Sequence, residues 1–228
     1  MNKLEIECKA QELQVHIWQQ RRRLWPEGIP CPVDMLDPEI AANVLGVNFE
    51  YHEELGRFGF HGTRFEIAGL LDRQACKIAV SRKFSPETIR FTGAHEIGHW
   101  LLHPGQVMHR DRPIKGLDSE TSSRAPQEKD ADYFAACFVM PRRLVTTAFE
   151  STFSVNVPFI FDDATAFRLC PNDPDSLLRP DSGSLDRALS LASAQSYGGR
   201  YFKSLSKQFR VSVTTMAIRL NELELIQE

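Results

Sequence analysis

Two histidines and one glutamate lie at a spacing that can bind a metal ion. His95, Glu96 and His99 form the pattern H-E-x-x-H. On a helix, residues four positions apart differ by about 40° around the axis, so both imidazoles face the same point. Zinc binds neutral imidazole nitrogens, and a catalytic zinc site keeps three protein ligands and an open fourth position. The pattern predicts a helical zinc site with Glu96 beside the open position.

Glu96 is the candidate general base of this site. A carboxylate there can take a proton from a water molecule as the water attacks a carbonyl carbon, and can later give it to the leaving amine. The metal polarises the carbonyl oxygen at the same time. These residues therefore predict hydrolysis of an amide bond. Because the bare pattern also arises by chance on solvated helix faces, the prediction requires a third ligand.

The next predicted helix supplies acidic residues for the third ligand. Glu128 and Asp132 are four residues apart in E-K-D-A-D, so they share one face of that helix. Glu128 can bind the zinc ion, while Asp132 can accept the ring N–H of a ligand histidine. A solvated acidic face would explain Glu128, but it would not explain the apolar run A-D-Y-F-A-A-C-F-V-M-P in the same helix.

His103 competes with Glu128 for the third position, because it continues the four-residue steps of the motif histidines. Over eight residues a straight helix turns by about 80° beyond two full turns and rises by about 12 Å, which disfavours three successive ligands. We expect His103 to cap the helix or to face the substrate near Pro104. His109 is expected in a loop, although four of the seven histidines fall between His95 and His109.

The elements around the motif are typical of an α+β protein. Ser85 and Pro86 begin the predicted helix that carries the motif. Short runs rich in aromatic and β-branched residues over 47–81 predict a small antiparallel or mixed sheet before this helix. Amphipathic and capping patterns predict further helices over 3–24 and 37–46.

The chain divides into three predicted parts. Residues 1–150 are predicted to form the core with the metal motif, a zinc metallopeptidase core if amide hydrolysis is its reaction, with a polar loop over 105–125 and a helix over 126–140. Residues 151–200 are predicted to be an additional regulatory or substrate-docking segment. Residues 201–228 are predicted to form a helical pair that packs on the core.

The last part resembles a helix-turn-helix, with a turn at Arg210 and Val211 and with Ser212 capping the second helix. Its basic residues are few, and Glu222 and Glu224 oppose them, so packing on the core is favoured over direct DNA binding. The apolar positions that are expected to be buried are Leu205, Phe209, Val213, Met216, Ile218, Leu220 and Leu223.

The composition describes a globular chain of 228 residues, with 42% hydrophobic residues and a net charge of −3. These values exclude a wholly disordered chain and argue against a surface built mainly for nucleic acid. The start is charged and lacks a secretory signal, and no run of about 18 apolar residues occurs, so a cytoplasmic protein without a membrane partner is predicted. The five scattered cysteines indicate no disulfide framework.

Cys170 is a candidate for a removable inhibitory zinc ligand. It lies in the proline-rich stretch R-L-C-P-N-D-P-D, and a thiolate can fill the fourth position of a zinc site. An ordinary loop thiol or buried thiol is the alternative.

The segments I-R-F-T-G-A-H-E-I-G-H-W-L-L-H and E-K-D-A-D-Y-F-A-A-C-F-V-M-P resemble the ImmA/IrrE family of bacterial metallo-endopeptidases. The family motifs match residues 90–103 and 128–141 in order. The resemblance implies a zincin-like protease core. In this core the helix with H-E-x-x-H is followed by a helix with E-x-x-x-D.

The resemblance also implies roles for the site residues and for the protein. His95, His99 and Glu128 would hold zinc, and Glu96 would be the general base. The family implies a cytoplasmic protease that cleaves a helix-turn-helix repressor, often encoded nearby, and so induces mobile-element, stress or defence genes.

The chain departs from the family pattern in two places. The stretch over 141–205 is longer than in many relatives, and Cys137 replaces an acidic or polar residue, where it is most simply a small core residue. Tyr133, His103 and several arginines all stay candidates for the group that stabilises the oxyanion. Two alternative functions are a DNA-binding regulator with a structural metal site and a zinc hydrolase of small amides.

Overall fold

The computed structural model describes residues 1–58, 65–111, 125–179 and 184–227. The chain folds into two compact units, Met1–Val139 and Met140–Glu228. The predicted boundary at residue 150 lies inside a helix of the second unit, Arg142–Phe153. Residues 151–200 and 201–228, predicted as separate parts, both belong to this second unit. The packing of the C-terminal helices on the peptidase core stays a prediction.

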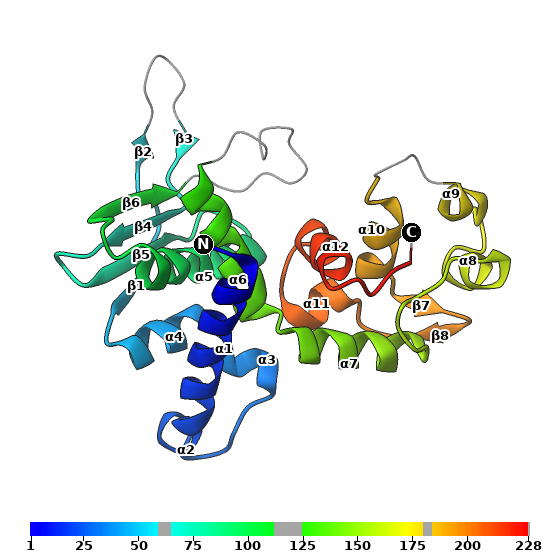
Figure 1. The fold of residues 1–228 in the computed structure, drawn as a ribbon, viewed down its shortest axis with the longest axis horizontal. Helices are drawn as coiled ribbons and strands as arrows, with labels where there is room; N and C mark the ends of the chain where they lie inside the picture. The colour runs from blue at the N-terminus through cyan, green and yellow to red at the C-terminus, as the bar shows by residue number, and fades with distance from the viewer. Residues whose placement is uncertain (59–64, 112–124, 180–183, 228) are drawn as a thin grey trace. The chain divides into compact units, whose positions relative to one another are not determined.

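The first unit combines helices with short strands, which confirms the predicted α+β class (Figure 1). Its helices are α1 (Lys3–Gln19), α2 (Arg21–Leu24), α3 (Pro32–Met35), α4 (Pro38–Leu45), α5 (Pro86–Leu102) and α6 (Pro126–Val139). Its strands are β1 (Asn48–His52), β2 (Arg57–Phe58), β3 (Phe65–Glu66), β4 (Gly69–Asp72), β5 (Lys77–Ser81) and β6 (Met108–Asp111).

Four of these strands form a mixed sheet in the order β1-β5-β4-β6. A small sheet is predicted from the sequence, but β6 is not, because it lies in the stretch over 105–125 that is predicted as a loop. Strand β1 is parallel to β5, and β4 is antiparallel to both β5 and β6. Strand β6 therefore lies at one edge of this sheet. Strands β2 and β3 form a separate antiparallel pair.

Helix α5 packs against β4, β5 and β6 of the sheet and against α6 (Figure 1). It begins as predicted, because the Ser85 side chain accepts a hydrogen bond from the Thr88 backbone N–H and Pro86 fits the first turn. Gly98 lets α6 approach closely, since a β-carbon at this position would lie 3.2 Å from both the α-carbon and the carbonyl oxygen of Ala131. This close packing fixes how side chains of α5 and α6 meet.

The second unit surrounds a core of aromatic side chains. Its helices are α7 (Arg142–Phe153), α8 (Asp163–Leu169), α9 (Asp175–Leu178), α10 (Asp186–Ser193), α11 (Leu205–Phe209) and α12 (Val213–Glu222), and its strands are β7 (Ser196–Tyr197) and β8 (Arg200–Tyr201). The ring of Phe153 lies 4.9 Å from that of Phe149 and 6.0 Å from that of Phe159, measured between centroids. Tyr197 and Phe202 contact the same ring edge-on.

The C-terminal helices join at the predicted turn. Arg210 adopts a left-handed conformation, and the Ser212 side chain accepts a hydrogen bond from the Thr215 backbone N–H at the start of α12. The expected burial of Val213 and Ile218 is wrong, because these side chains are 36% and 42% exposed. They lie on the side of α12 that does not face the core.

Arg219 is buried in the second unit rather than free to bind DNA. Its side chain is 1% exposed, and its Nε donates to the carbonyl oxygen of Met140 at 3.1 Å. Its Nη1 lies 3.2 Å from Glu222 Oε2. The guanidinium of α12 is thus engaged inside the protein, which leaves this helix poor in cations for phosphate contacts.

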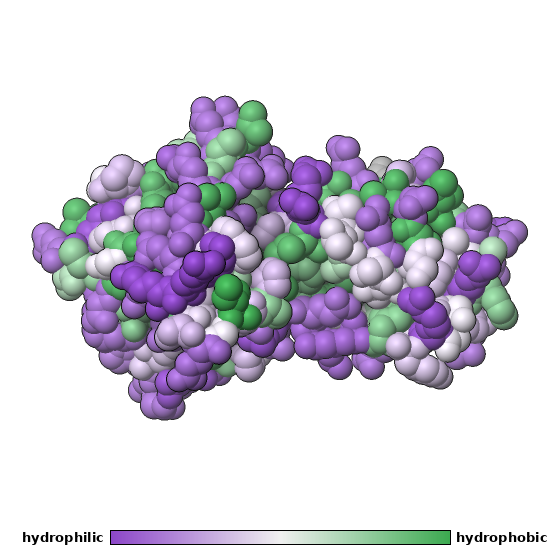
Figure 2. Space-filling view, turned by 90° about the horizontal axis from the view of Figure 1, so that it is seen from below, coloured by the Kyte–Doolittle hydropathy of each residue, from purple (hydrophilic) through white to green (hydrophobic). Residues whose placement is uncertain are grey.

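The face drawn in Figure 2 is largely hydrophilic, with apolar groups interspersed among polar ones. Across the described ranges, no helix combines the length and apolar character needed to cross a membrane.

Candidate metal centre

Helix α5 places the two motif histidines side by side in the interior. His95 and His99 are both fully buried, and their Nε2 atoms lie 3.0 Å apart. Two nitrogens bound to one tetrahedral zinc ion at about 2.0–2.1 Å are separated by about 3.3 Å. The two imidazoles therefore already converge on one point, as the four-residue spacing predicts.

Helix α6 brings Glu128 to the same point. Its Oε2 lies 3.5 Å from His95 Nε2, and its Oε1 lies 3.5 Å from His99 Nε2. The helix begins at Pro126, so Glu128 is in its first turn, and the contact at Gly98 keeps the two helices close. The structure thus brings together the three side chains that the sequence and the resemblance nominate as ligands.

Asp132 lies one helical turn after Glu128 and faces the outer side of the same histidine. Its Oδ1 is 2.9 Å from His95 Nδ1, the ring nitrogen that points away from the cluster. A carboxylate at this place can fix the histidine tautomer and raise the basicity of the ligand nitrogen. Asp132 is thus placed where it can accept the ring N–H of a ligand histidine, as expected from its spacing to Glu128.

His109 is also part of this cluster, and its predicted place in a loop is wrong. It lies on β6, where its side chain is buried between the exposed Met108 and Arg110. Its Nε2 is 3.0 Å from Glu128 Oε1, and its Nδ1 is 3.2 Å from Glu96 Oε2. The crowding of four histidines between residues 95 and 109 was the only sequence signal for it, because the strand sequence M-H-R-D does not alternate apolar and polar residues.

Four side chains together form a group that can bind a metal ion. Among the described residues, one ligand atom from each lies within 4.8 Å of all the others; the members are His95, His99, His109 and Glu128. Three imidazoles and one carboxylate are a donor set that suits zinc. The residues present therefore fit the metal that the H-E-x-x-H pattern predicts.

The ionisation of the cluster follows from its burial and its mixed charges. Burial disfavours the charged form of His95, but nearby carboxylates, Asp111 foremost, outweigh it and raise its pKa well above the usual value. Burial lowers the pKa of His99. Burial also opposes the charge of His109, but hydrogen bonding to Glu128 and Glu96 raises its pKa to about 9. A divalent cation bound by these side chains can replace the protons of His95 and His109 and balance the charge of the nearby carboxylates.

Glu96 lies beside the cluster and is fully buried between α5 and the sheet. Its Oε2 contacts His109, whereas its Oε1 has no hydrogen-bond partner within the described part of the chain. Gly69 on β4 makes room for it, since a β-carbon there would lie 2.5 Å from Glu96 Oε1. The carboxylate is therefore next to the candidate metal position, where a general base must be.

The motifs and the cluster lie in a part of the chain that matches one family model. Residues 57–158 match the family model Peptidase_M78, the IrrE N-terminal-like domain. The chain contains an ImmA/IrrE-type metallopeptidase domain. The match includes α5, α6 and the four side chains of the cluster, and it confirms the resemblance found in the sequence. A search of curated proteins found no match.

His103 lies outside the ligand group of this metallopeptidase domain. Its Nδ1 is 3.0 Å from His99 Nδ1, on the side of the His99 ring opposite the cluster. The end of α5 next to it is held by Arg73, whose Nη2 donates to the carbonyl oxygens of His99, Trp100 and His103. Arg73 thus satisfies carbonyl groups that a helix end leaves unpaired.

The other side chains named from the sequence lie away from the cluster or in the second unit. Tyr133 faces α1, where Lys3 Nζ is 4.9 Å from the centre of its ring. Cys137 is buried with 2% exposure, in agreement with a small core residue. Cys170 ends α8 in the second unit, and its inhibitory role stays a prediction.

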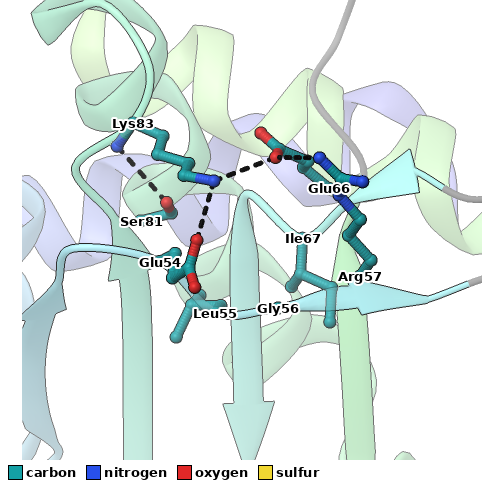
Figure 3. Close-up of a pocket in the computed structure, with 8 residues that line it drawn as sticks. All are labelled: Glu54, Leu55, Gly56, Arg57, Glu66, Ile67, Ser81 and Lys83. Atoms are coloured by element: carbon teal, nitrogen blue, oxygen red, sulfur yellow. Dashed lines mark hydrogen bonds and ion pairs between the residues drawn. The ribbon is translucent and has the colours of Figure 1, made fainter.

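A separate pocket lies near the ends of β2, β3 and β5 (Figure 3). Its charged groups pair with one another: Lys83 Nζ lies 2.7 Å from Glu54 Oε2 and 3.0 Å from Glu66 Oε1. Arg57 also contacts Glu66, at 3.3 Å. The pocket contains none of the four ligand candidates, so it is distinct from the candidate metal centre.

Proposed function

We propose that the protein is a zinc-dependent endopeptidase. The observation that carries this proposal is the convergence of His95, His99 and Glu128 within a buried cluster, with Glu96 beside it. This arrangement supplies metal ligands and a proton acceptor in one place, and the matched family is a metallopeptidase family. Among metals, zinc suits imidazole and carboxylate donors held by an H-E-x-x-H helix.

The chain's own residues would divide the work of amide hydrolysis. His95, His99 and Glu128 would hold the metal, and Asp132 would keep the His95 ring in its ligating orientation. A bound zinc ion supplies a Lewis acid for the substrate carbonyl. Glu96 would take a proton from the attacking water and deliver it to the leaving amine.

The proposed substrate is a protein, namely a helix-turn-helix transcriptional repressor encoded near this chain. The likeness to the ImmA/IrrE family supports this assignment, because that family implies cleavage of such repressors. Cleavage in the cytoplasm would then induce stress, mobile-element or defence genes. A direct DNA-binding role has less support, since Arg219 of α12 is buried.

The decisive experiment compares Glu96→Gln with the unchanged protein. The variant should keep its fold and one zinc per chain but lose cleavage by about 100-fold to 10,000-fold, because it removes the base and not a ligand. Metal analysis measures the zinc, and mass spectrometry of the repressor from the neighbouring reading frame measures cleavage.

His99→Ala and Glu128→Gln are the matched tests of the ligand set. Both should lose stoichiometric zinc. Full zinc content in both variants would refute the assigned ligands, and substantial turnover by Glu96→Gln would refute the assigned base.

A further inference from the structure

The three histidines of the cluster present the same ring nitrogen to its centre. The Nε2 atoms of His95 and His99 lie 3.0 Å apart, and Nε2 of His109 lies 3.0 Å from Glu128 Oε1. All four ligand atoms are mutually close, within 4.8 Å. His109 is therefore placed as a ligand would be, and not only as a neighbour of the site.

The other ring nitrogen of His95 and of His109, Nδ1, lies next to a carboxylate in both cases. His95 Nδ1 lies 2.9 Å from Asp132, and His109 Nδ1 lies 3.2 Å from Glu96 Oε2. Histidines that bind metals almost always direct the other ring N–H to a carboxylate, a carbonyl oxygen or water. The contact between His109 and Glu96 repeats the arrangement of His95 and Asp132, so both rings suit a tautomer with the proton on Nδ1.

We propose that His109 is a removable fourth zinc ligand that keeps the peptidase latent. This inference rests on the proposed function, since it describes the regulation of the same site. A catalytic zinc site needs its fourth position for water or substrate, whereas four protein ligands make a closed site. With His109 bound, that position is filled, and Glu96 Oε2 accepts the His109 N–H, so one imidazole occupies both the open position and one oxygen of the base.

The place of His109 in the fold suits a ligand that can leave. The other three ligands come from α5 and α6, which are packed closely at Gly98. His109 comes from β6, an edge strand that pairs only with β4 among the described strands. Edge strands have one hydrogen-bonded neighbour instead of two, so moving β6 need not separate the two helices. Activation is then the exchange of one imidazole for one water molecule.

The number of ligands can be tested on the full chain without a substrate. Zinc K-edge X-ray absorption counts the imidazoles on zinc, and acetohydroxamate binding to the cobalt-substituted protein, followed by visible absorption, reports open positions. The unchanged protein should show three imidazoles and weak acetohydroxamate binding. His109→Ala should keep one metal per chain, show two imidazoles and bind acetohydroxamate at least tenfold more tightly.

Two further variants make the test specific. Met108→Ala changes the exposed neighbour on the same strand and should behave like the unchanged protein. His109→Asn keeps a polar side chain of intermediate size, for the case in which the alanine variant does not fold. Circular dichroism verifies the fold of each variant.

Several outcomes would overturn the inference while leaving the proposed function intact. One is an unchanged protein with two imidazoles and the same acetohydroxamate affinity as the His109 variants. Another is the loss of metal from folded His109→Ala and His109→Asn, because His109 would then be required and not removable. An unchanged protein that binds no metal would instead refute the proposed function itself.

Discussion

The two units of the chain both have apolar cores, but they differ in how many ionisable side chains they bury. The first unit encloses ionisable groups, and His95, Glu96 and His99 are fully buried there. The second unit encloses aromatic rings around Phe153, and Arg219 is its only fully buried charged residue among those described. Buried aromatic rings stabilise a fold directly, whereas buried ionisable groups cost free energy unless they are paired or bound to a metal.

This contrast indicates where function lies. An aromatic core needs no further explanation than stability, but a cluster of imidazoles and carboxylates in the interior does. In the first unit the helices α5 and α6 and the strand β6 supply these groups to one point. We therefore expect substitutions in the second unit to change its stability, and substitutions around the cluster to change metal binding.

The largest expected effect is the loss of stability in the second unit when Phe153 is replaced by alanine. Phe153 is 1% exposed and contacts several rings, so Phe153→Ala should lower the free energy of unfolding by about 3–5 kcal/mol. Hydrogen exchange of the second unit's amides measures this loss. Phe167→Ala is the control, because Phe167 is 59% exposed and its replacement should change stability by less than about 0.5 kcal/mol.

Tryptophan fluorescence measures whether Phe153→Ala also lowers the stability of the first unit. All three tryptophans lie in the first unit, at positions 18, 25 and 100, so their fluorescence reports on that unit alone. Zinc affinity and the fluorescence transition should be unchanged in Phe153→Ala. A parallel shift of that transition would show that the two units unfold together, contrary to this prediction.

An intermediate effect is expected for Asp132→Ala in the first unit. Without the carboxylate beside His95 Nδ1, zinc affinity should fall by about 10-fold to 100-fold, while the second unit keeps its protection from hydrogen exchange. Competition with a coloured chelator measures the affinity. Asp130→Ala is the matched control, because Asp130 lies on the same helix and pairs with the N-terminal amine. Equal zinc affinities of the two variants would show that Asp132 does not support zinc binding.

The smallest expected effect concerns the contact between α5 and α6. Gly98→Ala adds a methyl group 3.2 Å from Ala131, which should cost about 1–3 kcal/mol by overpacking, offset by up to about 1 kcal/mol of helix propensity. Zinc should bind more weakly, because α6 and its Glu128 must move. Gly93→Ala clashes with Pro38 instead, at 2.9 Å, so it should lower stability without weakening zinc binding. Weaker zinc binding in Gly93→Ala alone would contradict this explanation.

The amino-acid sequence is enough to predict the α+β class, the helix that carries the motif and the family resemblance. These features depend on local signals: Ser85 and Pro86 begin a helix, and the four-residue spacing of His95 and His99 sets both on one face. The same helical rule placed Glu128 and Asp132 together on the next helix. Local spacing suffices here because each pair belongs to one continuous helix.

Long-range packing sets which separate elements meet at the candidate metal centre. His109 lies on β6, the strand that follows the motif helix, and it reaches the cluster because β6 pairs with β4 at the edge of the sheet. In the same way, Arg219 is buried and Ile218 is exposed because one side of α12 packs against the core of the second unit and the other side does not. Such contacts join residues across the sheet and between helices, and no short-range pattern in the chain specifies them.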